Sequence, residues 1–245
     1  MCDRSRAHRL LLQQLDWANP VLPSSVVLDL GSGHGGLSHE LVQTFGCQVL
    51  SFNISPEQNQ MNLEEAVRLG IADKITIEQG DFNNGLPAEW SSKFTHVLSC
   101  EVFCHAASKP KLLAEIFRVL KPGGAITFTD IMGADGADEK ALKDFTDRNA
   151  TTAMARPAQY RTDLSEAGFV NLGWWDGSAH LGKYFRAMLQ VCHDHREAML
   201  AEGVPEKYLG NWVSSLTDRC EIQESKGVFA WGIFSGRKPG PLFTA

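Results

Sequence analysis

The chain has 245 residues, of which 43% are hydrophobic and 21% charged. This balance excludes a disordered chain, and the length suits one large domain. The 23 Lys plus Arg residues are outnumbered by 29 Asp plus Glu, and the net charge of -6 disfavours a nucleic-acid-binding surface. No apolar run approaches the roughly 20 residues that cross a bilayer, and the N-terminus has no secretory signal. We therefore expect neither nucleic acid nor a membrane as a partner.

The cysteines point to a reducing compartment. Six cysteines are scattered along the chain without a Cys-x-x-Cys pair, which is typical of reduced thiols in a cytoplasmic protein. The run Cys192-His193-Asp194-His195 places only Cys192 and His195 on one side of a helix. Two ligands without partners make a poor zinc site, so we expect no metal.

The first half of the chain alternates short apolar runs with helical stretches. Strands are predicted at residues 26–30, 48–53, 75–79, 94–100 and 125–130, and helices at 35–45, 56–69 and 109–120. The Lys-Pro-Gly-Gly run at 121–124 is expected to turn the chain into the fifth strand. Strands separated by helical crossovers predict a parallel sheet covered on both faces.

The C-terminal third is less regular. Helices are predicted at 138–155, 158–167, 179–202 and 205–224, and strands at 170–176 and 228–234. A short amphipathic helix is predicted at 5–17. We interpret residues 1–245 as one domain, with an N-terminal helix (1–25), a cofactor-binding core (26–130), a cap and substrate region over the carboxyl edge of the sheet (131–226), and a closing strand and tail (227–245).

A glycine-rich loop follows the first predicted strand and precedes a helix. In Asp29-Leu30-Gly31-Ser32-Gly33-His34-Gly35-Gly36, glycines let the backbone approach a ligand beside a helix N-terminus. The spacing matches the dinucleotide fingerprint, but that motif expects an acid where the second strand ends, and Asn53 stands there. The acid Asp29 before the loop instead suits a cationic ligand such as S-adenosylmethionine, whose carboxylate can use the backbone donors of Gly31 and Gly33. The alternative is that these glycines only make a tight turn.

Asp81 and Phe82 follow the third predicted strand. An acid there can accept a hydrogen bond from the adenine amine while the aromatic ring packs on the base. Since the carboxyl ends of parallel strands share one edge of a sheet, we expect both residues to lie near the glycine loop.

These segments resemble the class I S-adenosylmethionine-dependent methyltransferases. The resemblance rests on the glycine loop, on Gly-Asp at 80–81 and on Arg-Val-Leu-Lys-Pro-Gly-Gly at 118–124. It implies an α/β, Rossmann-like fold: a seven-stranded, mostly parallel sheet with helices on both faces and a helical cap inserted before the last strands. The segment 51–58 is similar to the branch with cyclopropane fatty acid synthases and small-molecule N-methyltransferases, which implies that Asn53 and Gln58 contact the ribose.

Further segments resemble the sarcosine/dimethylglycine N-methyltransferases that make glycine betaine. They are 99–105, 129–132, 142–148, 160–161 and 230–232, with Met154 and Trp212. The resemblance implies a small amine as acceptor and adds Cys100 and His105 to the cofactor-binding set. Two departures stand out: family members have a longer segment before the first strand, and their Gln-Asp after the fourth strand reads Cys100-Glu101 here. We therefore expect either part of a longer or fused methyltransferase or a differently built lid; a homodimer is also open.

The chemistry of such an acceptor defines candidate side chains. A glycine derivative carries a carboxylate that an arginine fork can hold, and its methylated ammonium is stabilised by aromatic faces. Arg148 and Arg161 are the candidates for the carboxylate, although arginines on cap helices are often solvated or paired with an acid. His105 can accept a proton as a catalytic residue or simply cap the next helix. The candidates for the aromatic walls are Tyr160, Trp174, Tyr184 and Trp212.

Other functions stay open from the sequence. A methyltransferase for a different N-, O- or C-acceptor would carry the same cofactor loop, because the loop does not specify the acceptor. A non-catalytic domain that binds S-adenosylmethionine would also carry it.

Overall fold

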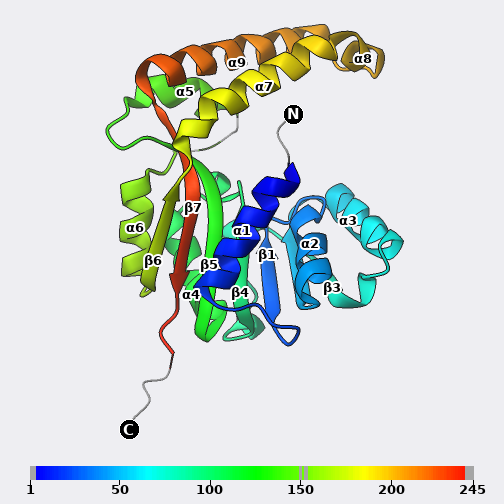
Figure 1. Cartoon of the computed structure of the whole chain (residues 1–245), viewed down its shortest axis with the longest axis vertical. Coiled ribbons are helices and arrows are strands. Elements are labelled where there is room, and N and C mark those ends of the chain that lie inside the picture. The colour runs from blue at the N-terminus through cyan, green and yellow to red at the C-terminus, as the bar shows by residue number, and fades with distance from the viewer. Residues whose placement is uncertain (1–3, 149–150, 152–153, 241–245) are drawn as a thin grey trace.

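The computed structural model describes residues 4–148, 151 and 154–240 (Figure 1). Within them, a seven-stranded sheet has the order β3-β2-β1-β4-β5-β7-β6. Strands β1 to β5 pair in parallel, and β7 is antiparallel to both of its neighbours. This arrangement confirms the predicted fold class. The strands are β1 (Val26–Leu30), β2 (Gln48–Asn53), β3 (Ile75–Gln79), β4 (Phe94–Cys100), β5 (Leu120–Gly133), β6 (Val170–Asp176) and β7 (Phe229–Arg237).

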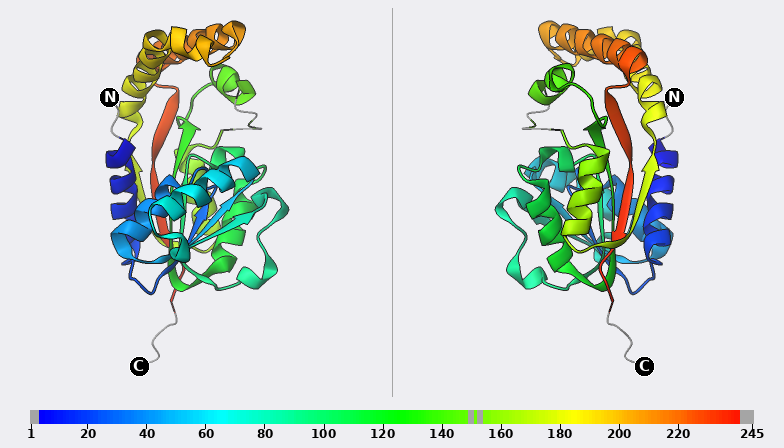
Figure 2. Two further views of the ribbon diagram at one scale, coloured as in Figure 1. Left: turned by 90° about the vertical axis from the view of Figure 1, so that its right-hand side faces the viewer. Right: turned by 90° about the vertical axis from the view of Figure 1, so that its left-hand side faces the viewer.

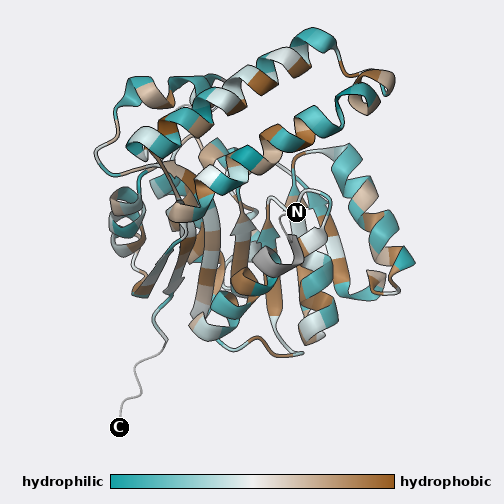
Figure 3. Cartoon of the chain, turned by 45° about the horizontal axis from the view of Figure 1, so that its top comes forward, coloured by the Kyte–Doolittle hydropathy of each residue, from teal (hydrophilic) through white to brown (hydrophobic). Residues whose placement is uncertain are grey.

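Helices cover both faces of the sheet. One face buries the apolar sides of α1 (Arg4–Ala18), α2 (Gly36–Phe45) and α3 (Pro56–Arg68). The other face buries α4 (Lys109–Val119) and α6 (Pro157–Glu166) in a second core (Figure 2). Hydrophobic residues dominate the strands, as a sheet buried on both faces requires (Figure 3).

A helical cap stands beyond the carboxyl edge of the sheet (Figures 1 and 2). It consists of α5 (Glu139–Arg148), α7 (Leu181–Asp194), α8 (Arg196–Ala201) and α9 (Glu206–Lys226). Helices α7 and α9 pack side by side as a hairpin around Cys192, Leu209 and Leu216. Polar and hydrophobic residues alternate along these helices, so each has one buried face (Figure 3). No helix among the described residues combines the length and apolar character needed to cross a membrane.

Several boundaries differ from the prediction. The run 121–124 lies within β5 instead of preceding it, because Gly123 N–H bonds to the chain after β7 and extends the ladder. The helix predicted at 138–155 ends at Arg148; Ala155 is not helical, and its carbonyl accepts from Gly133 N–H. The helix predicted at 179–202 breaks at His195, where ψ is 13°. Helix α6 and strand β6 belong to the core, although they fall within the range predicted as cap.

An aromatic stack joins the strands on the α4–α6 face. Phe128 of β5 stacks on Phe103 at 4.4 Å and on Phe234 of β7 at 5.0 Å between ring centroids. Phe234 in turn stacks on Trp174 of β6 at 4.3 Å, and Tyr160 of α6 packs edge-on against Phe128. The stack ties β5, β7 and β6 to α6.

Replacing Phe128 by Ala tests this stack. Because the ring is fully buried, its removal should lower the free energy of unfolding by about 3–5 kcal/mol. The matched control is Tyr208→Ala on α9, where the side chain is 63% exposed and the change should stay within about 0.5 kcal/mol. Urea denaturation measures both. Equal losses in the two variants would show that the stack does not stabilise the core.

Candidate active site

The glycine loop brings the end of β1 against the turn that follows β4. Gly31 has a φ of +82°, and its N–H donates to the Phe52 carbonyl at 2.8 Å, which ties the loop to β2. A Cβ on Gly31 would lie 2.5 Å from both methyl groups of Val102. A larger residue would therefore separate these two segments.

Gly33 faces open space instead. Its φ is +54°, and no heavy atom lies within 4 Å of the position that a Cβ would take. Within the described part of the chain, the Gly33 and His34 amides donate to no backbone acceptor, and the Ser32 hydroxyl is buried without a partner. Free donors beside the N-terminus of α2 suit the carboxylate of a ligand. The loop thus has the properties expected for the amino-acid end of S-adenosylmethionine.

Asp29 lies behind this loop. Its side chain is 2% exposed, and its Oδ2 accepts from Ser38 Oγ at 2.6 Å, with Ser51 Oγ a further 2.7 Å from Ser38. Burial raises the pKa of Asp29 to about 6. The network holds the first turn of α2 on the sheet; the direct cofactor contact expected of Asp29 stays a prediction.

The predicted ribose and adenine residues reach the same edge. Asn53 ends β2, and its Nδ2 donates to Oε1 of Gln58 in the first turn of α3 at 3.1 Å. Asp81 caps the short helix that follows β3 by accepting from Asn83 N–H, and Phe82 is half-buried beside it. The structure thus brings these residues to neighbouring strand ends, while their contacts with the cofactor stay predictions.

Cys100 and His105 belong to the segment after β4. Thr129 Oγ1 donates to Cys100 Sγ at 3.4 Å, and burial raises the pKa of this thiol to about 12. His105 is exposed, and its carbonyl accepts from Asn83 Nδ2 at 3.4 Å. Asn83 thereby links the turn after β3 to the turn after β4.

Glu101 is a candidate that our sequence reasoning treated only as a departure from the family. It has a φ of +58°, which is strained for a residue with a Cβ. Its backbone N–H donates to the Thr129 carbonyl, and its Oε1 accepts from Trp231 Nε1 at 2.5 Å. The side chain is open to solvent, yet the protein around it limits its hydration and raises its pKa. Its place directly after β4 was the signal that could have revealed it.

A second carboxylate lies at the end of the neighbouring strand. Asp130 is fully buried on β5; its Oδ2 accepts from Tyr160 Oη at 2.7 Å and its Oδ1 from Cys104 N–H at 3.2 Å. Burial first, and the charge of Glu101 second, raise the pKa of Asp130 to about 8. With this pKa, Asp130 is mostly protonated near neutral pH, so Glu101 is the carboxylate at this edge that can attract a cation such as an ammonium group.

The predicted acceptor residues do not converge there. Arg148 ends α5, but its side chain lies outside the described residues. Tyr160 is fully buried beneath Asp130, so the structure places it in the core instead of on a pocket wall. Trp212 packs within the α7–α9 hairpin against Arg219, and Tyr184 lies on the outer side of α7, 45% exposed.

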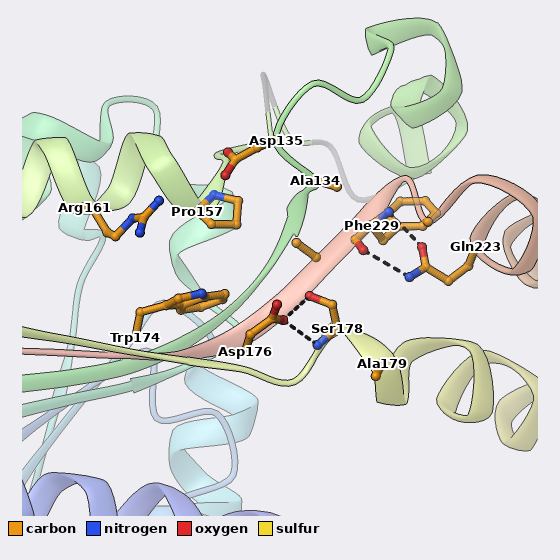
Figure 4. A pocket seen from close by; sticks show the side chains of 12 residues that line it. Ala134, Asp135, Pro157, Arg161, Trp174, Asp176, Ser178, Ala179, Gln223 and Phe229 are labelled. Carbon is orange, nitrogen blue, oxygen red and sulfur yellow. Dashed lines mark hydrogen bonds between the residues drawn. The ribbon is translucent and has the colours of Figure 1, made fainter.

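Arg161 and Trp174 meet in a separate pocket of about 360 Å³ (Figure 4). This pocket lies among α6, β6 and β7, with β5 between it and the strands that carry the predicted cofactor residues. No group of three or more His, Cys, Asp or Glu side chains in the described part of the chain could hold a metal ion.

Comparisons with known proteins identify the family. A methyltransferase domain model matches residues 23–188. The chain belongs to this family. It is 30% identical over 232 residues to the dimethylglycine N-methyltransferase of Parasynechococcus marenigrum, covering 92% of this chain and 79% of that protein. It is also 31% identical over 235 residues to the glycine/sarcosine/dimethylglycine N-methyltransferase of Actinopolyspora halophila, covering 96% of this chain.

This chain spans 41% of the length of the Actinopolyspora protein. A solved structure from Galdieria sulphuraria, proposed to be a sarcosine dimethylglycine methyltransferase, superimposes with a TM-score of 0.85 at 28% identity, covering 96% of this chain and 86% of that one. Solved structures with the same fold hold S-adenosylmethionine or S-adenosylhomocysteine. These findings confirm the predicted family and cofactor. A fused or longer protein and a homodimer stay predictions.

The predicted cofactor loop can be tested by comparing two glycines that flank α2. Gly33 precedes this helix and Gly46 follows it; both have positive φ values and no atom near the Cβ position. Alanine at either site should cost about 1–2 kcal/mol of stability. Only Gly33→Ala should weaken binding of S-adenosylhomocysteine in calorimetry, because only this methyl group would enter the space predicted for the cofactor. Equal affinities of the two folded variants would contradict the assignment.

Asp29→Asn tests the buried carboxyl group behind the loop. Because the pKa of Asp29 is about 6 in the folded protein against 3.8 ordinarily, folding retains its proton, and this carboxyl lowers stability as pH rises from about 4 to about 6. Asn cannot ionise, so the variant does not suffer this loss. The free energy of unfolding of the variant minus that of the wild type should therefore increase by up to about 3 kcal/mol between pH 4 and a pH above 6. Denaturation curves across this pH range measure the difference. A difference that does not vary with pH would contradict the burial effect.

Proposed function

We propose that the methyltransferase transfers a methyl group to the nitrogen of a small amine, with sarcosine or dimethylglycine as the acceptor on the route to glycine betaine. Two relatives with these substrates in their names align over more than nine-tenths of the chain. The observation that carries the proposal is the position of the Glu101 carboxylate. Glu101 directly follows β4, next to Val102, which contacts the glycine loop, and its carboxylate accepts a hydrogen bond from Trp231 of β7.

S-adenosylmethionine, when bound, supplies an electrophilic methyl carbon. The chain must then bind the amine, aim its lone pair and exclude water. Gly31 and Gly33 allow the loop to approach the cofactor, and Val102 fixes the loop against the turn that carries Glu101. The proposed sites for the methyl donor and the methyl acceptor are thereby adjacent.

Glu101 supports both binding and deprotonation of the acceptor. An alkylamine arrives as an ammonium ion, which this carboxylate attracts. Hydrogen bonds from Trp231 Nε1, from the Thr129 side chain and from the Ile131 backbone orient the carboxylate. It would accept the ammonium proton of the bound amine, so that the lone pair is freed. The raised pKa of Glu101 makes it a stronger proton acceptor than an ordinary glutamate. The indole rings of Trp231 and Trp175, whose centroids lie 5.8 Å apart, can stabilise the methylated cation.

A cytoplasmic site of action agrees with the thiols. The five described cysteines are all free, as expected in a reducing compartment.

Glu101→Gln tests the acceptor site. The variant keeps the shape and the Trp231 hydrogen bond but loses the charge and the proton acceptor. We expect kcat/KM for dimethylglycine to fall roughly 10- to 150-fold, with affinity for S-adenosylhomocysteine nearly unchanged. Glu166→Gln, on the exposed end of α6, is the control and should leave both unchanged. Wild-type activity should also rise with pH as more free amine forms.

The assay should include a panel of glycine, sarcosine, dimethylglycine and phosphoethanolamine, with mass spectrometry of the products. Turnover of sarcosine or dimethylglycine that depends on Glu101 supports the proposal. Turnover of another acceptor alone would overturn it in favour of a different methyltransferase. Cofactor binding without any turnover would identify a non-catalytic domain.

A further inference from the structure

The pocket around Arg161 lies where the cap joins the core. Its lining comes from the β5–α5 connection (Ala134, Asp135), the start of α6, the β6–α7 connection (Asp176, Ser178) and the α9–β7 connection. Figure 4 shows these segments facing one another across the pocket. A molecule bound here would touch every described place where the chain passes between cap and core.

Arg161 gives this pocket a free cation. The side chain is exposed, and it makes no hydrogen bond or ion pair with any residue that the structure describes. Most other arginines of the cap region are engaged; Arg186 pairs with Glu224 and Arg196 with Glu206. A guanidinium with open donors on a pocket wall is suited to a carboxylate, which it can hold with two parallel hydrogen bonds.

Other side chains that line the pocket are suited to an ammonium group. Asp135 uses Oδ1 to accept from Ala158 N–H, and Asp176 uses Oδ1 to accept from the backbone and hydroxyl of Ser178. The second oxygen of each carboxylate is left for a ligand. Trp174 packs on Phe234 and also lines the pocket, so its ring adds an aromatic surface for a methylated cation.

We propose that this pocket is a second ligand site, which binds a small zwitterion with a carboxylate and a methylated ammonium group. Arg161 holds the carboxylate, and Asp135, Asp176 and Trp174 surround the ammonium. A volume of about 360 Å³ is at the small end for ligand sites. Because such a ligand bridges the connections between cap and core, it fixes the position of the cap. The proposal goes beyond the methyl-transfer site and does not depend on Glu101.

Hydrogen exchange and calorimetry test this site in the full chain saturated with S-adenosylhomocysteine. The probe is trimethylglycine, which has no lone pair left to accept a methyl group. We expect saturable binding and slower exchange in peptides covering 133–137, 176–180 and 223–229. Arg161→Ala should weaken the binding tenfold or more, and Lys207→Ala, which removes an exposed charge from α9, should not. Acetate and tetramethylammonium, which each carry half of the zwitterion, should bind at least tenfold more weakly.

Three results would overturn the proposal: no saturable binding, the same binding in Arg161→Ala, or protection confined to 101–105. The last result would place trimethylglycine at the acceptor site alone. Glu101→Gln keeps the two proposals apart, because it should preserve the protection at 133–137 and 176–180. Loss of that protection in Glu101→Gln would mean that the two regions form one site.

Discussion

The contact between Gly31 and Val102 is the constraint on which the site depends. Strand β1 lies between β2 and β4, and the order of the sheet reverses there, so the segments that follow β1 and β4 meet at one edge. They can meet closely only because residue 31 has no Cβ. Val102 directly follows Glu101, so the same contact that shapes the cofactor loop also places an acid beside it. The missing Cβ of Gly31 thus sets the distance between the glycine loop and the turn that carries Glu101.

The acids at this edge oppose folding. Burial raises the pKa of Asp29, Glu101 and Asp130, which means that ionising each of them destabilises the folded chain. Hydrogen bonds from Ser38, Trp231 and Tyr160 offset part of this cost. Proteins commonly keep such unfavourable groups where function needs them. In the proposed function, an ionised Glu101 would attract the ammonium ion of the acceptor.

The cap is built differently from the core. Its α7–α9 hairpin has a small apolar cluster of its own, and a second cluster around Leu142, Phe145 and Phe229 attaches it to the start of β7. The cap therefore rests on the sheet through its connecting segments and through α5. A pocket lined by those segments is well placed to influence the cap, because a small change there is carried along rigid helices.

The sequence by itself determined the strands, most helices and the glycine loop, since all three depend on local periodicity, on glycine and on neighbours within a few residues. It also placed Asp81 and Phe82 near the glycine loop, because the carboxyl ends of parallel strands must lie together.

The positions of the residues considered for acceptor binding follow only from the tertiary structure. Trp231 reaches Glu101 across 130 residues of sequence, and the pairing of β7 with β5 brings them together. The strand order sets the pocket of Arg161 and Trp174 apart from the glycine loop, and the packing of α6 buries Tyr160 beneath Asp130. Such contacts join segments that lie far apart in the sequence, whereas the periodicity of a sequence describes only neighbouring residues.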